Sequence, residues 1–288
     1  MTSDHDALKH AASKEAALCT IVGIDGSFSR RCGAQLSVGR DGSLAGDMAD
    51  NCLNEELANQ AQAAMETGEA KLLRYGAGSP FIDFRLPCGA GLDIWIDPAP
   101  HRGALAHCVA ELESRRATAL DLAVNTAALS SEEKRPTLIS KRAYIPSPRL
   151  IILGTGSECA ALLGLAQAQG LTAEWREAGQ GLALGQPPAD LAVDAWTAIL
   201  LLFHDHEWEH TLLEWALGTP AFFIGAQGGA PARQTRHERL LASGHSEADL
   251  SRIRSPIGLI PRARDAGVLA LSAMAEVIAA HEALHPHR

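Results

Sequence analysis

The sequence is short of positive charge and of aromatic side chains, and it has no long apolar run. Its 288 residues carry 25 lysines and arginines against 34 aspartates and glutamates, a formal net charge of -9. Nucleic acid and anionic membrane surfaces attract proteins through positive potential, so we expect neither as a partner. No apolar stretch approaches the roughly 20 residues that a membrane-spanning helix needs. The polar N-terminus predicts no signal peptide, and we therefore expect a cytoplasmic protein.

Closely spaced cysteine pairs are also missing. The 6 cysteines lie far apart in the chain, at Cys19, Cys32, Cys52, Cys88, Cys108 and Cys159. No CxxC spacing of a zinc knuckle or redox motif is present, and without a secretion signal we expect reduced thiols. Each cysteine is then either a small core residue or a reactive ligand, and its local sequence must decide which.

The first half of the chain alternates between helical and strand patterns. The predicted elements are a helix ending near residue 17, a strand at 19–24, a hairpin at 34–45, a helix at 53–66, and strands at 71–75 and 92–96. Gly68 stands just past the second helix as a C-cap candidate. These elements predict an α+β domain over residues 1–130.

The second half predicts an α/β domain over residues 149–288. Between the halves, residues 131–148 are polar and rich in proline, and we expect a linker there. The apolar run 150–153 leads directly into Gly154, Thr155 and Gly156 and then into a helical pattern. Further strand-like runs at 171–175, 198–203 and 221–224, with helical stretches between them, predict a parallel, doubly wound sheet.

The glycine turn at Gly154 and Gly156 has the form of a dinucleotide-binding turn. Glycines at these places let a pyrophosphate approach the backbone N-H groups at a helix N-terminus. Cys159 replaces the third glycine, and the acid that would hold a ribose is ambiguous between Glu174 and Glu177. The turn predicts a Rossmann-like domain, either with a bound nucleotide or as a fold element without one.

A histidine-rich segment, residues 203–210, follows the buried strand at 198–203. It lies at the carboxyl edge of the predicted sheet, where such sheets bind ligands. Its stretch His206-Glu207-x-x-His210 matches a zinc metalloprotease pattern, but no third histidine follows at the usual spacing. A solvated cluster at a strand-to-helix turn is the alternative.

Two further cysteines and a basic loop predict a ligand pocket in the first half. Cys52 immediately precedes a predicted helix, whose N-terminus favours a thiolate, and Cys88 is followed by Gly89, which leaves room for a ligand. The loop at 27–33 adds Arg30 and Arg31. The alternatives are ordinary core cysteines and a solvated turn.

Taken in order, these segments resemble the XdhC/CoxI family of accessory proteins for molybdenum hydroxylases, over nearly the whole chain. The similar segments of the first half are 19–22, 26–34, 50–53 and 86–91. Those of the second half are 154–156, 204–207, 223–226, 255–259 and 271–276. The resemblance implies an α/β protein in which an N-terminal α+β domain of XdhC/CoxI type precedes a Rossmann-like XdhC domain.

The resemblance implies a chaperone that handles a cofactor and is not itself a hydroxylase. Such proteins bind molybdenum cofactor, as molybdopterin or its cytosine dinucleotide, work with a cysteine desulfurase that installs the terminal sulfur, and deliver it to a molybdenum hydroxylase apoenzyme. Cys52 and Cys88 are then the candidate molybdenum ligands, with Gly89 beside them. Arg30 and Arg31 would hold the phosphate.

In the second domain, the same resemblance implies that the turn at Gly154 and Gly156 binds the pyrophosphate of the cofactor, if the cofactor is the dinucleotide form. It makes His204, Asp205 and His206 a family motif, and the zinc-like match ending at His210 a coincidence. Alanine-rich helices would suit a homodimer interface, although they are also ordinary core. An NAD(P)-dependent oxidoreductase and a non-catalytic docking module for the client enzyme are the alternatives.

The chain departs from the family pattern at three places. Asp50 and Asn51 stand where the family commonly has two glycines. Ala90 stands where the family has the second glycine of a Cys-Gly-Gly stretch, so that this chain has Cys88, Gly89 and Ala90 there. The stretch 228–231, Gly-Gly-Ala-Pro, replaces a Gly-Ser-Arg-Arg-like loop, which leaves Arg233 as the nearest cation. The last change puts anion binding at that edge of the sheet in doubt.

Overall fold

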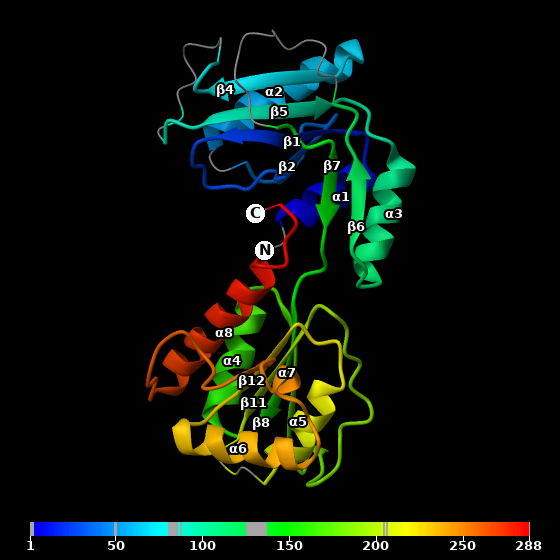
Figure 1. The fold of residues 1–288 in the computed structure, drawn as a ribbon. Helices are drawn as coiled ribbons and strands as arrows, with labels where there is room; N and C mark the ends of the chain where they lie inside the picture. Colours follow the sequence, from blue (N-terminus) through cyan, green and yellow to red (C-terminus); the bar gives the residue numbers. More distant parts are fainter. Residues whose placement is uncertain are drawn as a thin grey trace. The chain divides into compact units, whose positions relative to one another are not determined.

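The computed structural model describes residues 3–48, 51–79, 86, 88–124, 137–203, 205 and 207–287. The chain divides into two compact units (Figure 1), residues 1–146 with 285–288, and residues 147–284. The division falls after Pro146, whereas the sequence places a linker at 131–148. Within that range, strand β7 (Lys141–Tyr144) pairs with β6 (Thr118–Asp121) inside the first unit. Composition alone hides this strand because its segment is polar and flanked by prolines.

The first unit is built on a five-stranded antiparallel sheet in the order β3-β2-β1-β5-β4. Its strands are β1 (Ala16–Asp25), β2 (Gln35–Gly39), β3 (Leu44–Gly46), β4 (Lys71–Gly76) and β5 (Gly91–Asp97). Helix α2 (Asn51–Thr67) packs its apolar side, including Leu57 and Ala61, against one face of the sheet. The hairpin and the helix predicted from the sequence are both confirmed.

The other face of the sheet has a second, smaller apolar cluster. Helices α1 (Ser3–Ser13) and α3 (Arg102–Glu113) contribute to it, together with Leu120 of β6 and Tyr144 of β7. The expectation that the first helix continues to about residue 17 is wrong, because Ala16 and Ala17 open strand β1 and are buried in the sheet. Alanine is a good helix former, so local propensity favoured the helix and sheet pairing decided against it.

The second unit is a doubly wound sheet, as predicted, with all its strand pairs parallel and the order β10-β9-β8-β11-β12-β13. Its strands are β8 (Arg149–Gly154), β9 (Thr172–Ala178), β10 (Gly181–Leu182), β11 (Thr197–Leu202), β12 (Phe223–Ala226) and β13 (Ile253–Arg254). Its helices are α4 (Ser157–Ala168), α5 (Glu209–Leu217), α6 (Ala230–Ala242), α7 (Glu247–Leu250) and α8 (Ala266–Glu282).

Apolar residues alternate between the two faces of this sheet and are buried on both. Leu150 and Ile152 pack in the cluster that includes residues of α4 and α8, whereas Ile151 and Leu153 pack with residues of α5 and α6. Burial on both faces explains why these strands read as continuous apolar runs in the sequence. Within the described part of the chain, no helix has the length and apolarity to cross a membrane.

Candidate functional site

A buried ion pair lies at one end of the first unit's sheet. Arg74 of β4 donates from Nη1 to Asp93 Oδ2 of β5 at 2.7 Å, and the two side chains are 6% and 0% exposed. A second nitrogen of Arg74 lies 3.4 Å from Asp25 Oδ2 at the end of β1, and its Nε donates to the Ala77 carbonyl at 2.8 Å. One guanidinium therefore ties together the ends of three strands, β1, β4 and β5.

Glycines let the segment 88–91, which we call the Cys88 loop, lie close against this ion pair. A side chain at Gly91 would overlap the Arg74 guanidinium, and one at Gly76 would overlap the Ala90 carbonyl. Gly76 also has a φ of 73°, which favours glycine. Cys88 is exposed, and the neighbouring Gly89, at φ 70°, has open space around it. The loop thus presents a thiol to solvent from a backbone that is held in place behind it.

Burial distinguishes Cys88 from the other cysteines whose side chains the structure describes. It raises the pKa of Cys19 to about 12, and together with the nearby Glu158 and Glu177 it raises that of Cys159 to about 12. Burial is also the largest cause of the raised pKa values of Cys32 and Cys108. Such thiols remain protonated and unreactive at neutral pH. The side chain of Cys52, the second residue of α2, lies outside the described residues.

Arg30 lies beside the start of α2. Its guanidinium pairs with Asp47, whose other oxygen accepts from Asn54 Nδ2 at 3.2 Å. Asn54 in turn accepts from the Met48 backbone N-H at 3.0 Å. The loop that carries Arg30 is therefore linked through Asp47 to Asn54, in the first turn of the helix that carries Cys52, although the aspartate already faces the Arg30 charge.

The neighbouring Arg31 is part of a different group, near Arg142 and the C-terminal histidines. Burial, followed by the charges of Arg31 and Arg142, lowers the pKa of His285 to about 3. His287 Nε2 accepts from the Ala143 backbone N-H at 2.9 Å. The two adjacent arginines predicted to hold one phosphate thus have different surroundings.

The glycine turn of the second unit forms between β8 and α4. Gly154 has a φ of 155°, and a Cβ there would lie 2.9 Å from Cys159 Sγ and would also overlap the Leu202 carbonyl. Gly156, at φ 99°, is the N-cap residue of α4. The close packing explains why residue 154 is a glycine, with the side chain of Cys159 against it.

A carboxylate lies beside this turn. Glu158 is in the first turn of α4, and its Oε2 accepts from Ser157 Oγ at 3.2 Å. Glu174, one candidate for holding a ribose, lies 2.5 Å from Arg176. Trp175 donates from Nε1 to the Gly154 carbonyl at 2.8 Å. The backbone of the turn has the expected form, but the negative charge of Glu158 beside it opposes a pyrophosphate.

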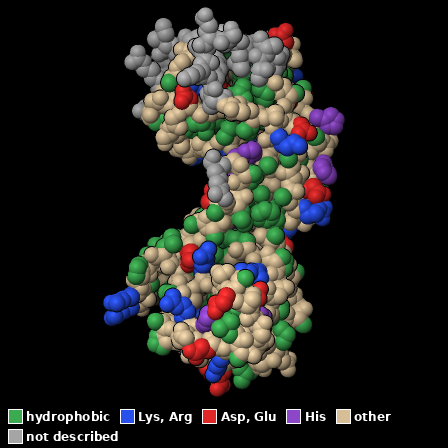
Figure 2. All heavy atoms as spheres, viewed as in Figure 1, with side chains coloured by type: hydrophobic (Ala, Val, Ile, Leu, Met, Phe, Trp, Pro, Cys, Tyr) green, Lys and Arg blue, Asp and Glu red, His purple; other side chains and the backbone are tan. Residues whose placement is uncertain are grey.

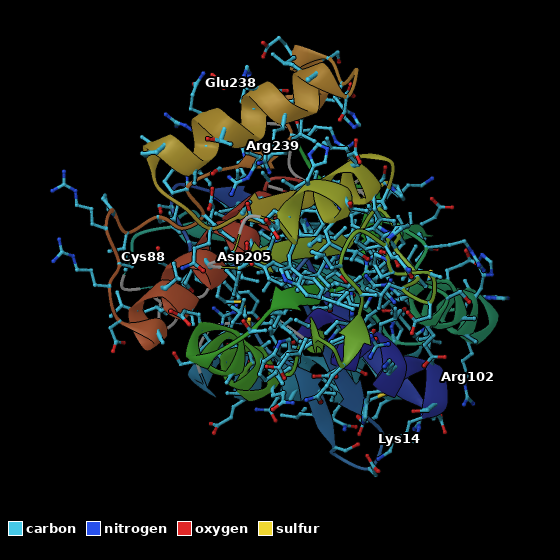
Figure 3. All side chains as sticks on the ribbon, turned by 90° about the horizontal axis from the view of Figure 1, so that it is seen from below. Lys14, Cys88, Arg102, Asp205, Glu238 and Arg239 are labelled. Carbon is cyan, nitrogen blue, oxygen red and sulfur yellow. The ribbon has the colours of Figure 1, made fainter. Side chains whose placement is uncertain are left out.

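The histidine-rich segment connects β11 to α5. Asp205 is exposed and accepts from the Glu207 backbone N-H at 3.0 Å, whereas His204 and His206 lie outside the described residues. His210 contacts Ser243 Oγ at 3.1 Å and Glu214 at 3.6 Å. Among the described residues, no group of three potential metal-ligating side chains comes together. Figure 3 labels Asp205 and Cys88, two predicted site residues that belong to different units.

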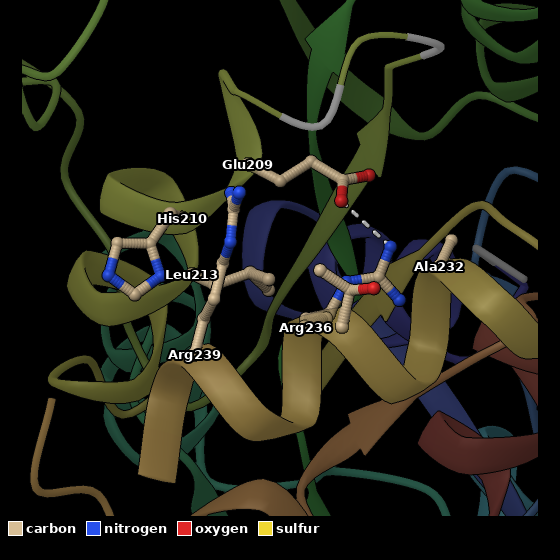
Figure 4. A pocket seen from close by; sticks show the side chains of 7 residues that line it. Glu209, His210, Leu213, Ala232, Arg236 and Arg239 are labelled. Atoms are coloured by element: carbon tan, nitrogen blue, oxygen red, sulfur yellow. Dashed lines mark hydrogen bonds and ion pairs between the residues drawn. The ribbon is translucent and has the colours of Figure 1, made fainter. Parts of the chain in front are cut away.

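Sequence reasoning missed a buried ion pair next to this segment. Glu209, the first residue of α5, accepts from Arg236 Nη2 of α6 at 2.8 Å, and both side chains are almost fully buried (Figure 4). Arg236 also donates to Ser255 Oγ at 2.6 Å and to the Gln227 carbonyl at 2.7 Å. The partners lie 27 residues apart, so no local pattern indicates them. Arg233, the cation noted from the sequence, is exposed.

Comparisons with known proteins cover both units. Residues 150–277 match the family model described as XdhC Rossmann domain, and residues 10–76 match that described as XdhC and CoxI family. The molybdenum cofactor insertion chaperone PaoD of Escherichia coli (strain K12) is 31% identical, over 96% of this chain and 89% of PaoD. A probable xanthine dehydrogenase subunit from Bacillus subtilis (strain 168) is 24% identical, over 92% of this chain and 93% of that protein.

A solved structure has the same fold. The crystal structure of a xanthine dehydrogenase from Bacillus halodurans superposes with a TM-score of 0.74, covering 99% of this chain and 97% of that one. Its sequence identity is 18%, so this likeness concerns the architecture.

Proposed function

Because this chain belongs to the XdhC and CoxI family, we propose that it binds molybdenum cofactor and inserts it into a molybdenum hydroxylase of the xanthine or aldehyde dehydrogenase type. The observation that carries this proposal is the 31% identity to the insertion chaperone PaoD over 96% of the chain. The cofactor is the cargo of such a protein, so the residues need to hold and release it rather than turn it over.

The Cys88 loop is the place we propose for the metal end of the cargo. Molybdenum with sulfur ligands is a soft centre, and an exposed cysteine sulfur suits it. Cys88 is exposed, and the buried pair of Arg74 and Asp93 fixes the backbone behind it. Gly89 leaves space on the solvent side. Cys52, at the start of α2, is proposed as the second thiolate.

The phosphate end of the cargo is proposed to lie near Arg30. Its guanidinium already pairs with Asp47, so a phosphate would have to compete with that carboxylate. A phosphate offers three oxygens and up to two charges, which favours it over the single half-buried carboxylate of Asp47. Arg31, which has different surroundings, and the turn at Gly154 and Gly156 are the alternative anion contacts, the latter for a dinucleotide form of the cofactor.

Two finer steps belong to the same proposal. A cysteine desulfurase would deliver the terminal sulfur while the cofactor is held, and a homodimer would be the binding form. His204, Asp205 and His206 are proposed to contribute to cofactor handling in the second unit; of these three, the structure describes Asp205, which is exposed.

The test is anaerobic binding of molybdenum cofactor, measured as molybdenum and pterin that co-elute with the protein. We expect stoichiometric binding to the wild type and a loss of at least about tenfold in affinity for Cys88→Ser and Cys52→Ser. Cys32→Ser is the matched control, because that thiol is partly buried and donates toward the Ile21 carbonyl.

Three outcomes separate the parts of the proposal. Loss in the Cys88 and Cys52 variants but not in the control supports both the chaperone function and the thiolate ligands. Equal binding by all four proteins supports the function and removes these ligands. An absence of binding by the wild type, under conditions in which PaoD binds the cofactor, overturns the function.

A further inference from the structure

The first unit contains a cavity of about 440 Å³ on the face of the sheet opposite to α2. Its walls come from β1, β5, α3 and β6. Ligand pockets for small molecules generally measure about 300–1,000 Å³ and combine apolar walls with a few polar groups. Histidine side chains are visible on the surface over α3, the helix that carries His107 and begins after His101, both of which line the cavity (Figure 2). The cavity therefore has the size that a small organic molecule needs.

Strand β5 contributes the carboxylate of Asp97 to this wall. Trp95 and Asp97 alternate along the strand with Ile94 and Ile96, which pack in the core against α2. Trp95 and Asp97 therefore belong to the opposite face, and both line the cavity. Much of the remaining wall is apolar and includes Leu120 of β6.

One oxygen of the Asp97 carboxylate is left for a ligand. Oδ1 accepts from the Ala99 backbone N-H at 3.0 Å, and no contact of Oδ2 is found within the described part of the chain. The side chain is half-buried, and Oδ2 is accessible from the cavity that it lines. Burial raises the pKa of Asp97, because its surroundings solvate the carboxylate poorly. A positive charge supplied by a ligand would therefore interact more strongly here than at the surface.

The other charged and titratable groups of the wall do not supply that positive charge. Asp121 is 84% exposed and pairs with Lys141 at 3.3 Å. His101 Nδ1 accepts from the Ala104 backbone N-H at 3.0 Å, so this nitrogen carries no proton. The described lining residues include no lysine or arginine. An anionic ligand would meet no compensating charge, so phosphates and carboxylates are unsuited to this cavity.

We propose that this cavity binds a small organic monocation, a protonated amine or guanidine with an apolar body, whose N-H group donates to Asp97 Oδ2. A hydrogen bond between a cationic N-H and a carboxylate is stronger than one between neutral groups. Apolar lining residues, among them Leu18 of β1 and Leu120 of β6, cover the body of the ligand. Because Asp121 already has Lys141 as its partner, the wall has one carboxylate to offer, which favours a single positive charge over several.

This site is separate from the one proposed for the metal end of the cofactor. Cys88 precedes Gly91 at the start of β5, and Asp97 is at the end of the strand. Six residues of extended chain span roughly 20 Å. The proposal does not depend on the chaperone function, and the two are tested separately.

The probe is phenethylamine, titrated calorimetrically into the cofactor-free, full-length protein at neutral pH. Its amine is protonated at that pH, as the amine of lysine is. Phenethyl alcohol is the matched ligand control, because a hydroxyl group replaces the ammonium group on the same apolar body. Phenylacetate carries a negative charge on a similar body.

Two variants test the carboxylate and the cavity independently. Asp97→Asn removes the charge and keeps the shape of the side chain. Ala104→Leu narrows the cavity, which Ala104 lines, and leaves Asp97 in place. Glu66→Gln is the matched charge control, because it removes one negative charge from an exposed position of α2, on the other face of the sheet.

We expect phenethylamine to bind the wild type at least about tenfold more tightly than phenethyl alcohol does, and phenylacetate to bind more weakly than either. Asp97→Asn should lose about tenfold or more in affinity for the amine and stay within about twofold of the wild type for the alcohol. Ala104→Leu should weaken the binding of both, whereas Glu66→Gln should remain within about twofold of the wild type. Thermal unfolding confirms that each variant is folded.

The proposal is overturned if phenethylamine does not bind at millimolar concentration, or if the alcohol binds the wild type as tightly as the amine does. It is also overturned if folded Asp97→Asn keeps wild-type affinity for the amine, or if folded Ala104→Leu binds both ligands as the wild type does. An equal loss in Glu66→Gln and Asp97→Asn would assign the attraction to the net charge of -9 and overturn it as well. The comparison of amine with alcohol uses the wild type alone, so it does not depend on the folding of any variant.

Discussion

Replacing Arg74 with methionine should destabilise the sheet of the first unit. The substitution keeps an unbranched side chain of similar length but removes the guanidinium that pairs with Asp93, a side chain at 0% exposure. Breaking a buried ion pair in this way costs about 3–5 kcal/mol. The lost hydrogen bond from Nε to the Ala77 carbonyl adds about 1 kcal/mol.

Hydrogen exchange is the appropriate assay, because the two units need not unfold together. Amides of β4 and β5 in Arg74→Met should exchange with an opening free energy lowered by about 4–6 kcal/mol, while amides of β8 and β11 stay unchanged. Arg40→Met is the matched control, since Arg40 pairs with Glu15 at the surface and is 53% exposed.

A double variant, Arg74→Met with Asp93→Asn, tests the cause. Removing the buried charge should restore at least half of the lost stability, because the cost arises from the ion pair that Asp93 loses with Arg74 rather than from packing. The reasoning is refuted if Arg74→Met lowers the opening free energy by less than about 1 kcal/mol, or if the double variant is no more stable than the single one.

Three further predictions concern other parts of the chain. Gly154→Ala should lower the thermal midpoint of the protein, because the added Cβ would overlap neighbouring atoms. Gly164→Ala, inside α4 with open space around it, should instead stabilise the protein by about 0.5–1 kcal/mol. Equal thermal midpoints of the two variants would contradict this prediction. Iodoacetamide should modify Cys88 long before Cys19, because Cys88 is exposed and burial raises the pKa of Cys19 to about 12. Mass spectrometry of the labelled peptides measures the order of modification, and labelling of Cys19 before Cys88 would contradict the prediction. The pKa of His285 is lowered from 6.5 to about 3, so its contribution to stability is present above pH 6.5 and is lost as the pH falls from 6.5 toward 3. Thermal midpoints measured at about pH 7.5 and about pH 5 should differ less for His285→Asn than for the wild type, and an equal difference would refute the assignment.

Much of the fold was predictable because it depends on short-range patterns. Periodicity located α2, and continuous apolar runs located β8, β11 and β12, since a parallel sheet buries both faces of its strands. The first helix was extended too far, because alanine suits both helix and buried strand. Strand β7 was missed, because its polar segment forms a strand only through pairing with β6.

The candidate site was predictable only in part. Glycine near a cysteine indicated the Cys88 loop, where Gly89 has a positive φ and open space around it, and Gly91 lies against the Arg74 guanidinium. Arg30 and Arg31 looked equivalent as neighbours in the sequence, yet Asp47 faces one and the C-terminal histidines lie near the other. The direction in which a side chain points from a loop depends on packing that the loop itself does not encode.

By itself, the sequence determined the two-part organisation, the parallel sheet of the second unit and the family, because each depends on residues close together in the chain or on an ordered series of motifs. Only the tertiary structure decided which distant residues meet. It paired Arg74 with Asp93 and Arg236 with Glu209, and it placed Trp95 and Asp97 on the wall of one cavity. Strand register and helix packing set these contacts, and both emerge when segments far apart in the sequence are buried against each other.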